Sequence, residues 1–184
     1  IVKFMENYFF HPETLPAVPR RDDAANDDFL FAQGPTRGLG KIRFHDPDAV
    51  FGRFDQPNVA VFREQIAALK TMLVMATPTK EQAQDIDFLL ALGEIFTLVV
   101  YGQLFLESAE IAGIDDDLID QVFDVLVRDW AGFAVDLHGK PTTTKEQAEY
   151  CIAMVRRPAA DAGRFERVWN QQVLSLRDAY EMAP

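Results

Sequence analysis

The carboxylate of Glu94 is the side chain in this sequence with the clearest potential for chemistry. It lies inside the most apolar stretch, residues 88–106, about two helical turns before Tyr101 and on the same helical face. Burial raises the pKa of a carboxylic acid, so a buried Glu94 could act as a general base. The alternative is a structural ion pair with an arginine of a neighbouring helix, such as Arg63 or Arg128. We prefer the ion pair, because structural pairs perturb pKa values just as well.

A glycine-rich segment, Gly34-Pro-Thr-Arg-Gly-Leu-Gly-Lys41, offers the second candidate. It does not match a phosphate-binding loop, because its outer glycines are one residue too far apart and Ile42 stands where a hydroxyl would hold magnesium. The segment therefore predicts an exposed glycine turn. Its two cations, Arg37 and Lys41, are the residues that could contact an anionic ligand or a partner chain.

No residue pattern indicates a metal centre or a hydrolytic triad. The three histidines, His11, His45 and His138, are scattered, and none forms a recognised metal pattern with another histidine or an acid. The acidic run 115–117 lacks the glycine and the bidentate glutamate of a calcium loop. No serine or cysteine sits on a nucleophile elbow. We therefore assign no catalytic residue and no metal site within this sequence.

Hydrophobic periodicity predicts an all-α fold in which helices position these residues. We expect residues 1–10 to be the end of a core helix of a longer polypeptide, residues 11–55 to be an irregular arm or tether rich in proline and glycine, and residues 56–184 to form a C-terminal helical bundle. The helices expected in this bundle cover about 58–75, 79–112, 115–138, 145–156 and 161–180. Short connections imply antiparallel neighbours, which makes the architecture an up-and-down helical bundle with an irregular N-terminal arm.

Several helix ends carry the residues that favour them. Gly113 is the expected C-cap of the second helix, and three acids at 115–117 suit the N-terminus of the third. His138 and Gly139 are typical of a helix exit, and threonines at 142–144 should cap the fourth helix. The fifth helix should carry its apolar side chains on one face; they are Phe165, Val168, Trp169, Val173, Leu176 and Tyr180.

Residues 88–106 are also long and apolar enough to cross a bilayer. Glu94 near the centre of this stretch, and the acids Asp85 and Asp87 before it, argue against a membrane span. No cluster of lysine or arginine sets an orientation. A helix buried on all sides within a bundle has the same composition. We therefore expect a buried helix and no membrane span.

Composition indicates a folded, acidic protein. The 184 residues suffice for one domain with its own core, and 48% of them are hydrophobic. The formal net charge of -11 disfavours nucleic acid and anionic membrane surfaces as partners, because both are negatively charged. The single cysteine, Cys151, cannot form an internal disulfide, which fits a reducing, cytoplasmic location.

Five stretches of the chain together resemble one known family. They are Ile1–Phe10, Gln33–Asp46, Leu92–Leu104, Leu126–Pro141 and Ala179–Pro184. They are similar to the C-terminal part of bacterial, especially actinobacterial-type, FAD-dependent acyl-CoA dehydrogenases, and the resemblance spans essentially the whole chain. In that family a helical domain follows a β-domain, and a Glu-Gly-Thr segment near the flavin carries the catalytic base in many members. No Glu-Gly-Thr occurs in this sequence, so the resemblance transfers no catalytic residue and implies a base upstream of Ile1.

The resemblance implies a parent reaction, the α,β-dehydrogenation of an acyl-CoA thioester, in which a carboxylate removes the α-proton and FAD takes the β-hydride. FAD would belong to the parent protein, and this segment alone would bind none. Residues 58–180 would be a helical extension that acts as scaffold and oligomerisation surface, with residues 11–55 as its tether. Its partners would be the N-terminal and middle domains of the parent chain and further copies in a homo-oligomer, and acyl-CoA would be the parent's substrate.

Two other hypotheses remain open at this point. Because no catalytic set is visible, the chain could be an independent helical interaction module, for example a small subunit that completes a partner enzyme. Alternatively, it could be a helical enzyme that uses Glu94.

Overall fold

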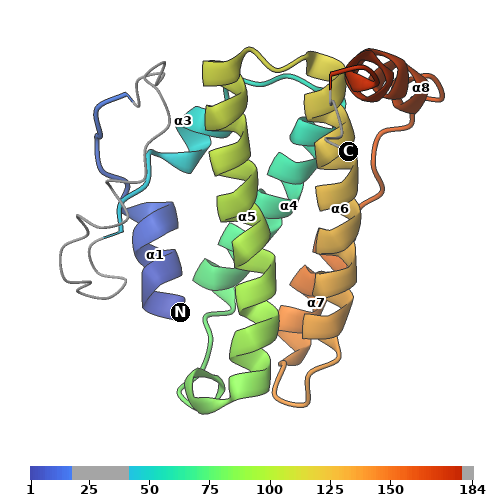
Figure 1. The fold of residues 1–184 in the computed structure, drawn as a ribbon. Coiled ribbons are helices and arrows are strands. Elements are labelled where there is room, and N and C mark those ends of the chain that lie inside the picture. The colour runs from blue at the N-terminus through green and yellow to red at the C-terminus, as the bar shows by residue number, and fades with distance from the viewer. Residues whose placement is uncertain (18–41, 180–184) are drawn as a thin grey trace, which may run out of the picture.

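The computed structural model describes residues 1–17 and 42–179, and these form an all-α bundle (Figure 1). The described ranges hold seven α-helices and no strand, which confirms the predicted fold class. The bundle consists of α4 (Pro57–Met75), α5 (Ile86–Ala112), α6 (Asp116–His138) and α7 (Lys145–Met154). The short helices α1 (Val2–Phe10) and α3 (Pro47–Phe51) lie on the far side of α5 from α6 (Figure 1). Helix α8 (Arg164–Val168) lies beside the N-terminal end of α6.

Local capping sets the ends of the long helices. α5 begins at Ile86 because the side chain of Asp85 accepts hydrogen bonds from the backbone of Asp87 and Phe88. The prediction of an unbroken helix from residue 79 is therefore wrong; residues 82–84 form a separate 3-10 turn. The other end is confirmed, since Gly113 takes the left-handed conformation at φ 68 that favours glycine.

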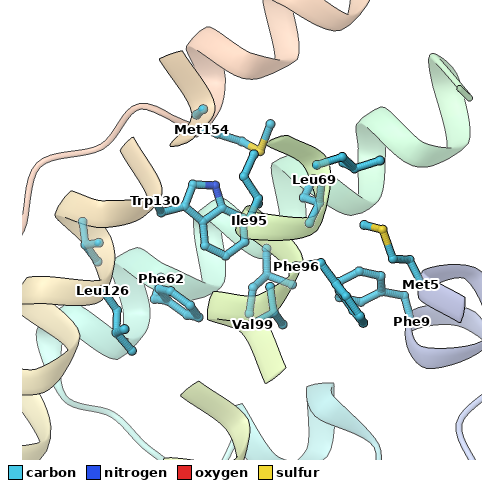
Figure 2. Packing of buried hydrophobic residues seen from close by; sticks show 14 of the residues in the cluster. Met5, Phe9, Phe62, Leu69, Ile95, Phe96, Val99, Leu126, Trp130 and Met154 are labelled. Atoms are coloured by element: carbon cyan, nitrogen blue, oxygen red, sulfur yellow. The ribbon is translucent and has the colours of Figure 1, made fainter. Parts of the chain in front are cut away.

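The core is one continuous hydrophobic cluster to which all the bundle helices contribute (Figure 2). Trp130 of α6 is fully buried, and its ring stands perpendicular to that of Phe62 at a centroid distance of 5.0 Å. On the other side of α5, Phe9 of α1 packs edge-on against Phe96 at 5.8 Å. Helix α1 is therefore an integral part of the bundle core.

Helix α3 lies within the range 11–55 that we expected to be irregular. Proline at its first position and Asp46, whose side chain accepts from the backbone of Asp48, explain why a helix starts here. Val50 and Phe51 are buried in the core cluster. The described part of the arm thus contributes to the core; the function of residues 11–55 as a tether stays a prediction.

The C-terminal segment does not form the single helix predicted for residues 161–180. After α8 it continues as a π-helical turn, Trp169–Val173, and a 3-10 turn, Leu174–Leu176. The buried side chains here are Arg164 and Val168, which share one face. Phe165 lies about 100° away from Arg164 around the helix and is 65% exposed. The inward arginine therefore leaves Phe165 and Trp169 of the predicted apolar face toward solvent, whereas Val168 of that face is buried. Tyr180, also predicted on this face, lies outside the described residues.

An identical pentapeptide, Thr-Lys-Glu-Gln-Ala, occurs at 79–83 and again at 144–148, and the structure pairs the two copies. In each, the threonine and the glutamine form a reciprocal capping arrangement. The two glutamines, Gln82 and Gln147, also exchange amide hydrogen bonds of 2.6 and 3.0 Å. Each side-chain amide nitrogen donates once more, to the backbone oxygen of Thr142 and of Ala76 respectively. This paired cap ties the start of α7 to the α4–α5 connection.

Candidate functional site

Glu94 lies on the solvent side of α5, so the prediction of a buried carboxylate is wrong. The expected arginine partners are also wrong, since Arg128 pairs with Asp124 at 2.6 Å and neither Arg63 nor Arg128 pairs with Glu94 within the described residues. The buried positions of α5 recur every three or four residues and face α1, α4 and α6, which leaves Glu94 on the opposite side. Arg37 and Lys41, the other candidate contacts, lie outside the described residues.

The exposed side of α5 is apolar, contrary to the prediction of a helix buried on all sides. We call it the α5 face, and its members are Ile86, Leu90, Gly93, Glu94, Thr97, Tyr101 and Leu104. Ile86 is 71% exposed and Leu90 is 62% exposed, while Tyr101 and Leu104 are 56% and 46% exposed. Because exposed apolar patches on folded proteins commonly mark sites of association, this face is the first candidate functional surface.

A groove of about 620 Å³ runs along the N-terminal half of the α5 face. Its walls are apolar and come from three elements, with Ile1 preceding α1, Phe133 on α6, and leucines of α5. Gly93 lies in the groove without a side chain, and its nearest neighbour across the groove is the Ile1 side chain. Glu94 is the one ionisable residue among those that line the groove. The groove thus combines an apolar surface with a single carboxylate.

Among the described helices, α5 is the one long and apolar enough to cross a membrane, judged by length and composition alone. Less than half of its most apolar window is buried in the fold. A core helix of a soluble protein meets the same criterion, so this property by itself assigns no membrane location.

A second candidate site joins the N-terminal arm to α5 through His45. Its Nδ1 lies 2.7 Å from Oε1 of Glu107 on α5, and its Nε2 lies 3.1 Å from the backbone oxygen of Pro16. Both partners are hydrogen-bond acceptors, so the ring must carry two protons to make both bonds. An imidazolium has no free lone pair, and therefore this histidine is neither a metal ligand nor a general base in this state. We call His45, Glu107 and Pro16 the arm clamp.

The arm clamp continues into the core as a polar network. The amide nitrogen of Gln103 donates to the backbone oxygen of His45 at 2.9 Å, and the buried hydroxyl of Tyr8 donates to the amide oxygen of Gln103. Burial, followed by the charge of Glu107, raises the pKa of Tyr8 well above its usual range. Tyr8 therefore stays neutral, and the network positions α1, the arm and α5 relative to one another.

We expect the arm clamp to open as pH rises. The hydrogen bond with Glu107, followed by the bond with the Pro16 backbone, raises the pKa of His45, while burial and the charge of Arg53 oppose the shift. A pKa raised by folding means that the clamp stabilises the protein fully below the unfolded value of about 6.5 and less as pH rises through the folded value. Hydrogen-exchange protection factors for residues 11–17 should fall as pH rises. NMR measures the deprotonation of His45 over the same pH range, and the two changes should coincide.

Two variants control this prediction. His45→Gln should remove the pH-dependent step in arm protection. Glu107→Gln replaces the carboxylate that raises the pKa of His45 most with a neutral amide, so the NMR titration of His45 should move to lower pH. An unchanged titration midpoint in Glu107→Gln would show that the carboxylate does not hold the ring as the structure indicates.

Sequence reasoning missed a buried charge cluster beneath α8. The guanidinium of Arg164 is 4% exposed, contacts Asp120 and donates to Asp124 at 2.6 Å. Asp120 also accepts from the backbone and side chain of Asn58 on α4. All these groups have partners, so the cluster is a structural link between α4, α6 and α8. The burial of these three charged side chains could not be predicted from sequence, because it depends on tertiary contacts between α6 and α8.

The described residues contain no set that completes a catalytic or metal centre. No group of three or more histidine, cysteine or acidic side chains within them could hold a metal ion. Burial raises the pKa of Cys151 to about 11, so its thiol stays protonated and unreactive near neutral pH.

Comparison with known proteins adds no relative. No protein-family model, no curated protein and no solved structure matches this chain.

Proposed function

We propose that this chain is the C-terminal helical region of a flavin-dependent acyl-CoA dehydrogenase and that it works there as a scaffold and association surface. The exposed α5 face is the observation that carries the second part. Large apolar side chains such as Ile86 and Leu90 are more than half exposed, and covering such a side chain contributes about 1.5–3 kcal/mol. The five stretches that resemble the family support the first part.

The proposal assigns the FAD site to other domains of the parent protein, and the lining of the groove on the α5 face supports this assignment. The groove on the α5 face presents one carboxylate, Glu94, and no cation that would hold a pyrophosphate. The proposal therefore places flavin, catalytic base and most acyl-CoA contacts in other domains of the parent protein. It also places the protein in the cytoplasm, without a membrane span and without nucleic acid as a partner.

The proposal predicts the mass of the natural protein and the colour of this segment. Protein purified from its native source should have a denatured mass far above 20.8 kDa, the mass of this chain. The purified natural protein should show flavin absorbance and reduce an electron acceptor with an acyl-CoA substrate. This chain expressed alone should be colourless.

A different set of results would support the alternative. A denatured mass of 20.8 kDa for the protein from its native source, with no flavin in the purified protein, would support the alternative. In that case this chain would be an independent helical interaction module that completes a partner enzyme. A yellow preparation of this chain alone would contradict the assignment of the flavin site to other domains.

A further inference from the structure

The α5 face is self-complementary about its midpoint. Its exposed positions follow one another at intervals of three or four residues, which keeps them on a single stripe of the helix. Thr97 lies at the centre of the stripe, and Leu90 and Leu104 lie at equal distances on either side. We propose that two copies of this chain pack α5 against α5, antiparallel, about a two-fold axis at Thr97. This rests on the proposed function only in using the α5 face as the association surface.

The register follows from the symmetry. In an antiparallel pair centred on Thr97, residues whose numbers lie equally far before and after 97 face one another. Leu90 thus meets Leu104 of the second copy, and Gly93 meets Tyr101 of the second copy. The pairing is isologous, so the association closes at a dimer.

Large and small side chains alternate in this register. Tyr101 is 56% exposed, while Gly93 lies without a side chain in the groove of about 620 Å³. The ring of Tyr101 from each copy would occupy the groove of the other, against Leu89, Leu98 and Phe133. At the axis the hydroxyl of Thr97 donates to the backbone oxygen of Gly93 at 2.8 Å, so covering the threonine leaves no unpaired hydroxyl.

The single charge of the groove also finds a partner in this arrangement. Among the described residues Glu94 has no hydrogen bond and no ion pair within 4 Å, and Lys140 interacts with it only through its charge at longer range. Covering an unpaired carboxylate is costly, so an occupant of the groove has to bring a hydrogen-bond donor. Tyr101 of the second copy, which faces Gly93, supplies a hydroxyl beside Glu94. A phenol hydroxyl does so without adding a charge, and the pair repeats on both sides of the axis.

Disulfide trapping in the full-length protein tests the register directly. Thr97→Cys should form a covalent homodimer under mild oxidation, because the two introduced thiols meet at the axis. Mixing Leu90→Cys protein with Leu104→Cys protein should give a mixed dimer in higher yield than either variant alone. Ile152→Cys is the control, because Ile152 lies on α7, off the α5 face, and is 56% exposed, between Leu104 at 46% and Leu90 at 62%. The native Cys151 is buried and should not interfere.

Sedimentation measures whether the protein is a dimer, and it separates the proposed register from the more general proposal that the α5 face is an association surface. A dimer that weakens in Leu90→Glu, together with the predicted cross-links, supports the register. A dimer that weakens in Leu90→Glu but forms no cross-link at Thr97 overturns the register and leaves the α5 face as the association surface. A protein that stays monomeric at high concentration overturns self-association. The dehydrogenase assignment is decided separately, by the denatured mass and the flavin content of the natural protein.

Two further variants test the predicted hydrogen bond. Tyr101→Phe removes this hydrogen bond on both sides of the axis and should weaken the dimer about a hundredfold, roughly tenfold for each bond to a charged group. Glu94→Gln keeps an acceptor but removes its charge, so it should weaken the dimer less. The double variant should be no weaker than Tyr101→Phe alone, because that variant already removes the bond. Independent, additive losses would contradict the contact between these two residues.

Discussion

Replacing Arg164 with leucine is expected to destabilise the protein by about 3–5 kcal/mol, the typical cost of removing one partner from a buried ion pair. The guanidinium of Arg164 lies between Asp120 and Asp124 and is 4% exposed. Without it, Asp120 stays buried at the junction of α6 and α8 with no cation to compensate it, and Asp124 keeps only its pair with the exposed Arg128. Urea unfolding followed by circular dichroism measures the loss.

Arg167 provides the matched control for this substitution. It also bridges two acids, donating to Asp117 and Asp161 at 2.6 and 2.7 Å, but its side chain is 43% exposed. Solvent screens exposed pairs, so Arg167→Leu should destabilise the protein much less than Arg164→Leu. If the two variants lose the same stability, burial does not decide the strength of these pairs.

The double replacement of Asp120 and Asp124 distinguishes loss of attraction from exposure of unpaired charge. Converting both to asparagine in the Arg164→Leu background removes the buried carboxylates. Stability should then recover in part, because a neutral buried group is less costly than an unpaired buried charge. A further loss instead would show that hydrogen bonds to Asn58, and not unpaired charge, dominate the cluster.

The parts of the fold that sequence could predict are those specified by neighbouring residues. Gly113 ends α5 because a left-handed conformation favours glycine, and Asp115 starts α6 because its side chain accepts a backbone hydrogen bond. Both signals act within a few residues of the helix end. The all-α class follows in the same way from helical periodicity repeated along the chain.

The orientation of α5 could not be predicted by these means. Its side chains are apolar around almost the whole helix, so periodicity does not indicate which face is buried. Glu94 was therefore placed in the core when it lies on the exposed side. The packing of α1 and α6 against the other faces of α5 determines which side of the helix is exposed, and these tertiary contacts cannot be read from the pattern of apolar residues.

In the C-terminal segment, too, the apolar pattern did not predict which side chains are buried. Its apolar stripe, which includes Phe165 and Trp169, is the pattern of a helix that buries this face. Asp120 and Asp124 on α6, 44 and 40 residues away in sequence, draw Arg164 inward, and Phe165 and Trp169 are left exposed. The repeated pentapeptide at 79–83 and 144–148 is a signal that the sequence does carry, because identical capping segments indicate equivalent positions at two helix starts.

Trp130→Ala is expected to destabilise the protein by about 3–5 kcal/mol, because removing a fully buried indole leaves a cavity that rigid neighbours fill only in part. Trp130 contacts side chains from several helices at the centre of the bundle, and Figure 2 shows it beside Met154 of α7 and Phe62 of α4. Its ring meets the Phe62 ring edge to face. The loss should appear in urea unfolding with little change in the native helical content.

The two tryptophans of the chain form a natural pair of controls for this prediction. Trp169 is 46% exposed, so Trp169→Ala should cost well under half as much as Trp130→Ala. Trp130→Phe is more informative, because the indole nitrogen of Trp130 has no hydrogen-bond acceptor among the described residues. Phenylalanine removes that unpaired donor and keeps most of the apolar volume, so its cost should be about 1–2 kcal/mol. If Trp130→Phe were as damaging as Trp130→Ala, an acceptor must reach the indole nitrogen in solution. The side-chain oxygens of Gln56 and Gln65, both buried without a donor, are the acceptors to test by substitution.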